Sequence, residues 1–371
     1  MQTMTFSRQD CFKQCPKKHQ FAYELGIRPS EDATALRMGS SFHDALKAAA
    51  NQATFNEAIA VIRERYDAIP EGYDPQTWLY EQETVERMFC GNVWRWQDQP
   101  LNYVAKERGF SLPLKNPATG AASREWLWEG KIDGIVKLDD GRIAVVEHKL
   151  LSEDLDPSSP LWRRMRVDHQ ISLYVLAARQ LGYPVESVLY DVTRKPTIKP
   201  TGVPAVDVNG MKIVVDAYGT RIANKGGEWR QTASAKDGYS LISRPMTAEE
   251  WGVKLTADIA ERPDFYFARV EIPRLDQDLE ECLYELWDIQ KTIRAAQVND
   301  RHYRTCNKNT CGFCAYFDLC TTGWSAKYPL PEGFVKVTDL HPELLRDSND
   351  DAKCTADSAT EEITAVATAS T

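Results

Sequence analysis

Three charged side chains lie inside a stretch that otherwise has the pattern of two buried strands. Residues 130–150, GKIDGIVKLDDGRIAVVEHKL, contain Asp133, Glu147 and Lys149 among mostly apolar neighbours. The central DDG sequence predicts a hairpin with a three-residue loop and Gly141 in the left-handed conformation. In that register Asp133 faces Glu147 across the two strands, and the two-residue strand period places Lys149 on the same face as Glu147.

This cluster of charges could do metal-assisted chemistry. Two carboxylates at cross-strand distance repel each other, and both resist ionisation unless a cation lies between them or one keeps its proton. A hard divalent cation resolves the conflict, and Lys149 beside it could orient or deprotonate an attacking water. A surface hairpin with a cross-strand salt bridge is the simpler alternative. Val145, Val146, Ile132 and Ile135, however, make both faces apolar, as in a covered sheet.

A second cluster of reactive side chains lies near the C-terminal end. The sequence CNKNTCGFCAYFDLC holds four thiols within fifteen residues: Cys306, Cys311, Cys314 and Cys320. In a cytoplasmic chain such spacing indicates a metal site rather than disulfides. Four local thiolates suit Zn²⁺, and the same ligands can hold a [4Fe–4S] cluster, so the spacing alone leaves the metal open.

The elements that must position these residues form a mixed α/β pattern. Apolar periodicity predicts helices near 40–65, 75–96, 168–181, 247–259 and 275–296. Strands are expected at 108–114, 126–138, 142–150 and 186–192. We expect one domain over 1–335, with a core at about 36–193, an insertion at about 194–244 and C-terminal helices with the cysteines at 245–325. No internal repeat is evident.

Composition restricts the class of protein. A chain of 371 residues that is 43% hydrophobic can bury a substantial core. No segment approaches the roughly 20 apolar residues of a membrane span, and no signal peptide is evident, so we expect a cytoplasmic protein without membrane contact. The net charge of −9 argues against a broadly basic DNA-coating surface. Residues 346–371 are acidic and poor in large apolar side chains, which predicts a disordered tail.

The hairpin carries a resemblance to a known family. GKID followed by VVEHK resembles the paired signature of the PD-(D/E)XK nuclease superfamily, with Asp133 as the first acid and Glu147, His148 and Lys149 as the D/E-x-K element. MGSSFHDAL resembles the upstream helix of that family, which places its metal-ligating histidine at His43. The resemblance implies that Mn²⁺ or Mg²⁺ is held by His43, Asp133, Glu147 and the carbonyl of His148. It also implies that Lys149 aligns the attacking water.

A further segment points to one subgroup. DHQISLYVLAARQLG resembles the Gln-x-x-x-Tyr helix of RecB-like members, which falls on Gln170 and Tyr174. In this family the pair contacts DNA near the scissile phosphate. The resemblance implies a restriction-endonuclease-like core, in which helices flank a mixed central sheet.

The N-terminal cysteines extend the likeness to iron–sulfur nucleases. SRQDCFKQCPKKHQFAYELGI resembles the start of the AddB nuclease domain and of Cas4-like nucleases, where one early cysteine joins a late C-x2-C-x5-C. This implies a helical periphery clipped by a structural [4Fe–4S] cluster on Cys15, Cys311, Cys314 and Cys320. Cys11 and Cys306 are extra, and either could replace Cys15 or Cys311. Zn²⁺ is the alternative metal at this site.

Two basic segments are candidate DNA contacts. LWRRMRVDHQ contains Trp162 and three arginines, Arg163, Arg164 and Arg166. VTRKPTIKP contains Arg194, Lys195 and Lys199, and it also resembles phage and prophage members of the RecB-like group. Basic residues with an aromatic ring suit phosphates and a stacked, unpaired base, whereas a solvated charged loop is the alternative.

Together these features predict a metal-dependent DNA exonuclease that acts on single-stranded or frayed ends. The resemblance implies a role in phage-type recombination or repair, in a bacterial or phage-infected cell, with a recombination, helicase or integrase partner. The alternative function is a non-catalytic scaffold subunit that contains zinc and binds nucleic acid.

Overall fold

The computed structural model describes residues 1–344, which fall into two compact units. The first unit comprises Met1–Gly39, Trp96–Thr193 and the chain from Phe267 onward, and the second comprises Ser40–Arg95 and Arg194–Tyr266. Within these 344 residues, no helix combines the length and the apolar character that a membrane span requires. The tail expected at 346–371 lies outside the described residues.

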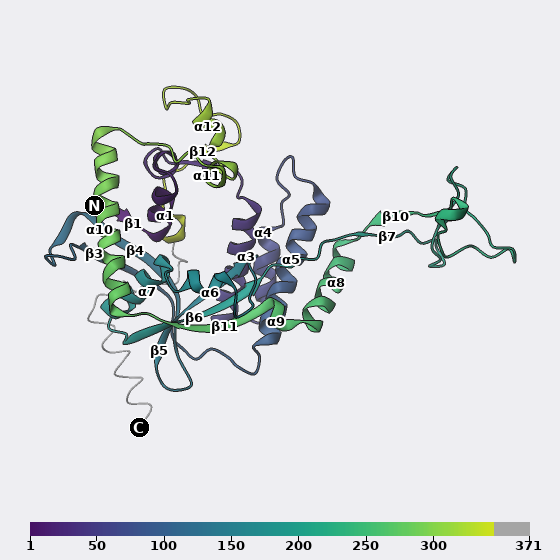
Figure 1. Ribbon diagram of the computed structural model, residues 1–371, viewed down its shortest axis with the longest axis horizontal. Helices are drawn as coiled ribbons and strands as arrows, with labels where there is room; N and C mark the ends of the chain where they lie inside the picture. The colour runs from purple at the N-terminus through teal and green to yellow at the C-terminus, as the bar shows by residue number, and fades with distance from the viewer. Residues whose placement is uncertain (345–371) are drawn as a thin grey trace. The chain divides into compact units, whose positions relative to one another are not determined.

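A mixed six-stranded sheet forms the centre of the first unit (Figure 1). The strand order is β1-β4-β5-β6-β11, and β3 pairs with β4 off this path. Strand β1 runs parallel to β4, whereas β3 and β5 run antiparallel to it. The strands are β1 (Gln2–Met4), β3 (Tyr103–Lys115), β4 (Ala122–Lys137), β5 (Ile143–Leu151), β6 (Val185–Arg194) and β11 (Phe267–Pro273). The expected mixed sheet is confirmed, although β1 and β11 were not anticipated.

The hairpin of β4 and β5 has the register predicted from its loop. Gly134 pairs with Val146 and Lys137 with Ile143, so the numbers of facing residues sum to 280. The loop closes through a hydrogen bond from Leu138 N to Arg142 O at 2.8 Å. Gly141 has a φ of +88°, the left-handed conformation that this loop requires.

Helices cover the sheet beside the β4–β5 hairpin. Helix α7 (His169–Gln180) packs against β4 and β5, and α1 (Phe6–Gln14) and α10 (Asp276–Asn299) pack against α7. Helix α7 begins where the sequence predicts, because the Asp168 carboxylate accepts a hydrogen bond from Gln170 N and caps its first turn. The short helix α6 (Pro160–Met165) precedes it.

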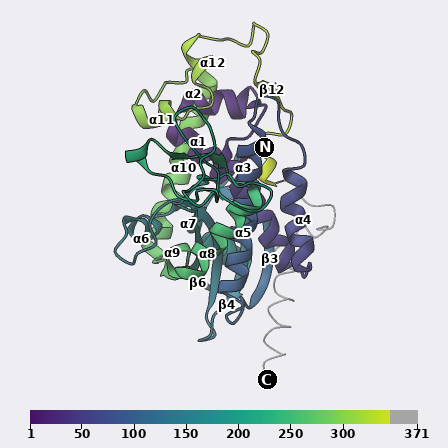
Figure 2. The same ribbon diagram turned by 90° about the vertical axis from the view of Figure 1, so that its right-hand side faces the viewer.

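The two ends of the described chain meet in a smaller apolar cluster. Strand β12 (Phe334–Lys336) pairs antiparallel with β2 (Ile27–Pro29). Phe21, Tyr316 and Leu319 are buried together in this cluster. Figure 2 shows the N-terminal helices α1 and α2 beside the C-terminal α11 and α12. The short elements here are α2 (Pro16–His19), a π-helix (Gln20–Glu24), α11 (Lys308–Gly312), α12 (Phe317–Thr321) and a 3₁₀ turn (Pro342–Leu344).

The second unit is mainly helical. Its helices are α4 (Phe55–Arg65), α5 (Pro75–Arg95), α8 (Ala248–Glu261), α9 (Pro263–Tyr266) and most of α3 (Thr34–Ala50). The single helical stretch expected near 40–65 is wrong, since α3 and α4 are separate helices. The break has a physical cause: Gln52 has a φ of +67°, and Thr54 starts α4 with a capping box to Glu57.

Residues 202–245 of the second unit contain a short repeat that was not anticipated from the sequence. Strands β7 (Gly202–Pro204) and β10 (Ser243–Pro245) form a ribbon, and β8 (Val214–Val215) pairs with β9 (Ser240–Leu241). Between them, three turns begin at Asp207, Asp216 and Asn224. In each turn the side-chain oxygen accepts from the backbone N–H groups two and four residues later. A glycine with positive φ follows three residues after each. Only the Asx and Gly positions repeat, so the pattern is too sparse to stand out.

Candidate active site

The paired strands β4 and β5 bring the three predicted charges together. Glu147 is 2% exposed, and its Oε1 lies 2.6 Å from Lys149 Nζ. The backbone N–H of His148 donates to Asp133 Oδ2 at 3.1 Å, which holds the first acid against the opposite strand. Because the hairpin register fixes both strands, the two carboxylates and the amine share one face of the sheet.

Helix α7 adds two polar side chains to this cluster. Lys149 Nζ donates to Gln170 Oε1 at 2.7 Å, and Gln170 Nε2 donates to the Tyr174 hydroxyl at 3.2 Å. Gln170 and Tyr174 are four residues apart and therefore lie on one helix face. The structure thus brings Asp133, Glu147, Lys149, Gln170 and Tyr174 together in the first unit.

Burial and charge shift the acid–base properties of this cluster. Burial raises the pKa of Glu147 to about 8 against the opposing effect of Lys149, and the charge of Asp133 raises it further. For Lys149, burial favours the neutral amine, but the carboxylates of Glu147 and Asp168 outweigh it and raise the pKa. These neighbouring carboxylates therefore favour the ammonium form of Lys149, which donates hydrogen bonds. Asp168 was anticipated only as a helix cap.

The donor set fits a divalent cation. Glu147 Oε2 is buried and has no hydrogen-bond partner among residues 1–344. Leaving a buried carboxylate oxygen unsatisfied is costly, and a cation between it and Asp133 removes both that cost and the repulsion of the acids. Residues 1–344 contain no ready-assembled group of three or more His, Cys, Asp or Glu side chains around one point. His43 lies on α3 in the second unit.

The imidazole of His148 lies in a different set of contacts from its neighbours Glu147 and Lys149. Its Nδ1 lies 3.4 Å from Asp191 Oδ2, and its Nε2 lies 3.3 Å from the Tyr103 hydroxyl. Asp191 is buried on β6, and its Oδ2 also lies 3.1 Å from Nη2 of Arg269, with which it forms an ion pair. Burial opposes protonation of His148, but the charge of Asp191 prevails and raises the pKa.

This network was missed in the sequence, although Asp191 in the apolar strand VESVLYDVTR carries the same signal as the hairpin acids. Close packing here requires a glycine. A Cβ on Gly134 would lie 2.6 Å from the ring of Tyr103 and 2.8 Å from Val146 Cγ1. The network therefore fixes β5 from the side of the His148 imidazole.

The structure gathers cysteines from both ends of the chain. Cys15 Sγ accepts from Thr305 N at 3.5 Å, and Cys311 Sγ lies 3.7 Å from Thr305 O. Cys314 interacts electrostatically with both. Two separate segments, 290 residues apart along the chain, therefore place sulfurs beside one residue.

The other cysteines have different surroundings. Cys11 is buried in the apolar cluster with Phe21, and burial raises the pKa of its thiol to about 12. Cys320 packs at the edge of the same cluster, and Cys306 is exposed.

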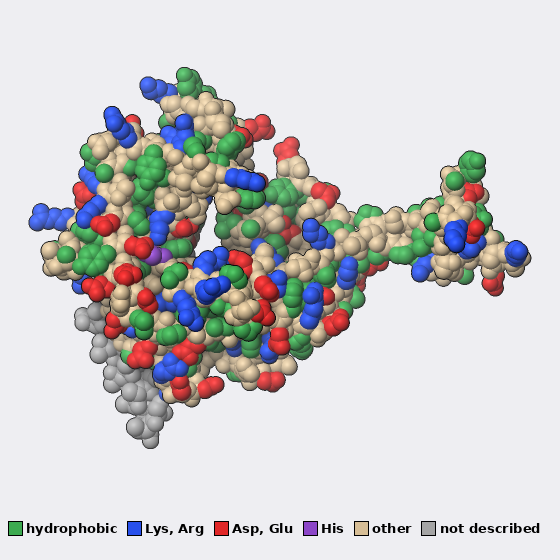
Figure 3. Space-filling view, viewed as in Figure 1, with side chains coloured by type: hydrophobic (Ala, Val, Ile, Leu, Met, Phe, Trp, Pro, Cys, Tyr) green, Lys and Arg blue, Asp and Glu red, His purple; other side chains and the backbone are tan. Residues whose placement is uncertain are grey.

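The predicted aromatic DNA contact is wrong. Trp162 is only 9% exposed, and its Nε1 donates to the carbonyl of Asp156 at 3.1 Å, so the ring cannot receive a base. Arg164 pairs with Glu153 at 2.7 Å. Arg194 stacks 4.0 Å from the Phe265 ring, and burial lowers the pKa of Lys195. Figure 3 shows basic and acidic side chains interspersed on the face in view.

Comparison with known proteins gives one family match. The sequence model of one family, described as the PD-(D/E)XK nuclease superfamily, matches residues 3–321. No curated protein matches the chain. A solved structure titled "Crystal structure of SSO0001" aligns with this chain over 87% of each of the two chains, at 12% identity and a TM-score of 0.32. This similarity is too low to indicate a common fold.

Proposed function

Because the chain belongs to the PD-(D/E)XK nuclease superfamily, a group of metal-dependent nucleases, we propose that it is a DNA exonuclease acting on single-stranded or frayed ends. The observation that carries the proposal is the buried, unpartnered Glu147 Oε2 beside Asp133 and Lys149. An unsatisfied carboxylate oxygen in the core would destabilise a purely structural scaffold, whereas a catalytic cation needs such an oxygen as a ligand.

The residues of the site divide the work of phosphodiester hydrolysis. Bound Mg²⁺ or Mn²⁺ supplies Lewis-acid stabilisation of charge that develops on the phosphate. Asp133, Glu147 and the His148 carbonyl would hold that ion. Lys149, held between Glu147 and Gln170, donates to the attacking water and orients it toward phosphorus.

Gln170 and Tyr174 position the DNA strand in this proposal. Gln170 holds Lys149 through its oxygen and Tyr174 through its amide nitrogen, so one side chain couples the amine to the helix face. Burial and the nearby charges of Glu147 and Asp133 raise the pKa of Tyr174 well above its ordinary value. Its hydroxyl therefore stays protonated and can donate to a phosphate oxygen.

We further propose a structural [4Fe–4S] cluster on Cys15, Cys311, Cys314 and Cys320. The shared contact of Cys15 and Cys311 with Thr305 supports this set. Cys11 is a weaker choice than Cys15, because it is buried in the apolar cluster with Phe21, whereas Cys15 lies beside Thr305 with Cys311. The cluster joins the chain ends and takes no part in hydrolysis. Zn²⁺ is the alternative metal.

The proposed setting is phage-type recombination or repair in the cytoplasm, as for RecB-like and Cas4-like nucleases. A helicase, recombination or integrase protein would be the partner. The resemblance of the Gln-x-x-x-Tyr helix and of the cysteine spacing supports this setting.

The test begins with protein purified without oxygen. An absorption spectrum with iron and zinc analysis identifies the metal at the cysteines. Digestion of end-labelled single-stranded and duplex DNA with Mn²⁺ then measures cleavage. We expect a brown protein that contains iron and degrades single strands from their ends.

The matched pair of variants is Asp133→Asn and Asp139→Asn. Asp133 lies in the site, whereas Asp139 is an exposed acid in the loop of the same hairpin. We expect only the first substitution to abolish cleavage. A colourless zinc protein that binds DNA without cutting it would instead support the scaffold function. Internal cleavage of circular single strands would contradict the exonuclease assignment.

A further inference from the structure

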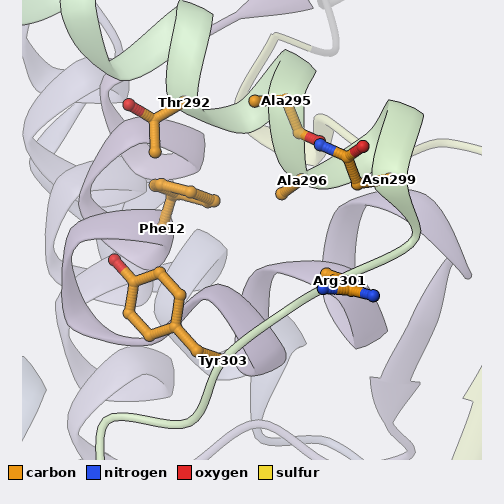
Figure 4. A pocket seen from close by; sticks show the side chains of 7 residues that line it. All are labelled: Phe12, Thr292, Ala295, Ala296, Asn299, Arg301 and Tyr303. Atoms are coloured by element: carbon orange, nitrogen blue, oxygen red, sulfur yellow. The ribbon is translucent and has the colours of Figure 1, made fainter.

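An open pocket of about 550 Å³ lies in the first unit, and none of the residues assigned above lines it. Helix α1 contributes Phe12, and helix α10 contributes the opposite side. The residues that line it are Phe12, Thr292, Ala295, Ala296, Asn299, Arg301 and Tyr303 (Figure 4). Its volume falls within the roughly 300–1,000 Å³ of pockets that hold small organic groups.

Two aromatic rings give the pocket an apolar interior. Phe12 is 4% exposed and anchored in the main core, whereas Tyr303 is 64% exposed. Figure 4 shows the Tyr303 ring pointing toward Phe12. Among residues 1–344, the Tyr303 ring has neither an aromatic nor a cationic partner. An exposed, unpartnered ring above an apolar floor is a surface on which a planar group can stack.

Polar groups at the rim match the remaining parts of a nucleotide. The Arg301 guanidinium has no carboxylate partner within the described chain, so it is available to a phosphate. Asn299 donates through Nδ2 to the carbonyl of Ala295 at 2.9 Å, which leaves its side-chain oxygen to accept from a base N–H. A ring surface, a cation and an amide acceptor together match one nucleotide of a single strand.

A short run of contacts links this pocket to the candidate active site. Gln9 lies three residues before Phe12 on the same face of α1, and its Nε2 lies 3.1 Å from His169 Nδ1. His169 directly precedes Gln170, which accepts from Lys149. The contact of α1 with α7 therefore connects the helix that lines the pocket with the helix that carries Gln170, within the first unit.

We propose that the Phe12–Tyr303 pocket binds one unpaired nucleobase of the DNA strand, with Arg301 on the adjoining phosphate. The identity of the strand as the nuclease substrate rests on the proposed function. This pocket supplies the stacking ring that Trp162, buried in the fold, cannot provide. Capture of an unpaired base would favour single-stranded or frayed ends over intact duplex, whose bases are stacked.

The first experiment measures binding of a fluorescent single-stranded oligonucleotide to full-length protein in the non-cleaving Asp133→Asn background. Tyr303→Ala should weaken binding about tenfold, as loss of one stacked base does, and Tyr303→Phe should restore it. The matched control is Tyr328→Ala, since Tyr328 is 66% exposed in the same unit. Arg301→Ala should lower the number of ions released on DNA binding by about one, as measured from the salt dependence of affinity. Arg124→Ala, at another exposed arginine, should leave that number unchanged.

A second experiment locates the base. Oligonucleotides carrying 5-iododeoxyuridine at one position at a time are irradiated with the protein, and the cross-linked peptide is identified by mass spectrometry. We expect Tyr303 or Phe12 to cross-link from one position of the strand. Equal affinities of the Tyr303→Ala and Tyr328→Ala proteins, or cross-links only elsewhere, would overturn the proposal. The proposal would also be overturned if the pocket bound free deoxynucleoside monophosphate but the Tyr303→Ala substitution did not change the affinity for the DNA strand.

These outcomes separate the pocket from the nuclease assignment. If the protein cleaves DNA but the Tyr303→Ala substitution does not change strand affinity, the nuclease assignment stands and the base-binding role of the pocket is refuted. If Tyr303 cross-links to the strand but the wild-type protein does not cleave DNA, base binding is supported and the nuclease assignment is refuted.

Discussion

The β4–β5 hairpin and the cysteine region around Thr305 are assembled in different ways. In the hairpin, Asp133 and Lys149 are sixteen residues apart, and regular strand pairing fixes them. In the cysteine region, Cys15 and Cys311 come from opposite ends of the chain and meet through irregular segments around Thr305. The hairpin site therefore depends on a few local hydrogen bonds, whereas the cysteine site depends on the closure of nearly the whole first unit.

This difference predicts which region determines activity and which determines stability. Changes in the hairpin should remove chemistry and leave the fold. Changes in the cysteine region should loosen the fold and spare the chemistry of molecules that stay folded. The predictions below test this division, from the largest expected effect to the smallest.

The largest effect is expected from Lys149→Met. The substitution removes the ammonium held between Glu147 and Gln170, so cleavage should fall by about 10³-fold. The measurement is the single-turnover rate on end-labelled single-stranded DNA with Mn²⁺. Lys137→Met, at the far end of β4, is the control and should cleave normally. A Lys149→Met protein that cuts at the normal rate would refute the assigned role.

The next effect concerns stability. Cys311→Ser should remove the metal from the cysteine region and lower the Tm on the order of 10 °C, because a clip that closes this long a loop contributes roughly 5 kcal/mol at most. Thermal unfolding, metal content and the cleavage rate per folded molecule are the measurements. Cys90→Ser, on α5 of the second unit, is the control. Full metal content and an unchanged Tm in Cys311→Ser would show that this cysteine is no ligand.

A smaller loss of activity is expected from Gln170→Leu. Without the side-chain amide, Lys149 loses the oxygen that accepts from it and the Tyr174 hydroxyl loses the nitrogen that donates to it, so cleavage should fall about tenfold. The Tm should change little. Gln180→Leu, an exposed position at the end of the same helix, serves as the comparison. Equal rates for the two variants would remove Gln170 from the site.

The smallest effect is a pH dependence of stability in the cysteine region. His19 is fully buried, accepts from Arg8 Nε at 3.1 Å, and burial lowers its pKa. Below its ordinary value of about 6.5, the unfolded chain takes up a proton that the folded protein resists, so stability falls with pH. The Tm should drop by a few degrees between about pH 7 and pH 5.5. In His19→Asn this fall in Tm should be smaller than in the wild-type protein. An equal fall in both proteins would show that another group causes the pH dependence.

Local patterns were sufficient to predict the hairpin and its site. Strand alternation, the DDG loop and the Asp168 cap each act over a few residues, so the register, the left-handed Gly141 and the start of α7 could all be read from the chain. Acids in apolar strands then marked the site, because burying charge is costly without a purpose.

What the sequence could not determine depends on contacts between distant segments. The burial of Trp162, the His148–Asp191 pair and the meeting of Cys15 with Cys311 all arise from packing of elements far apart in the chain. The Phe12–Tyr303 pocket is of the same kind. No local period encodes such contacts, since they depend on how whole helices and strands pack together. Residue types alone therefore predicted the candidate site, and only the tertiary structure decided which side chains stay exposed.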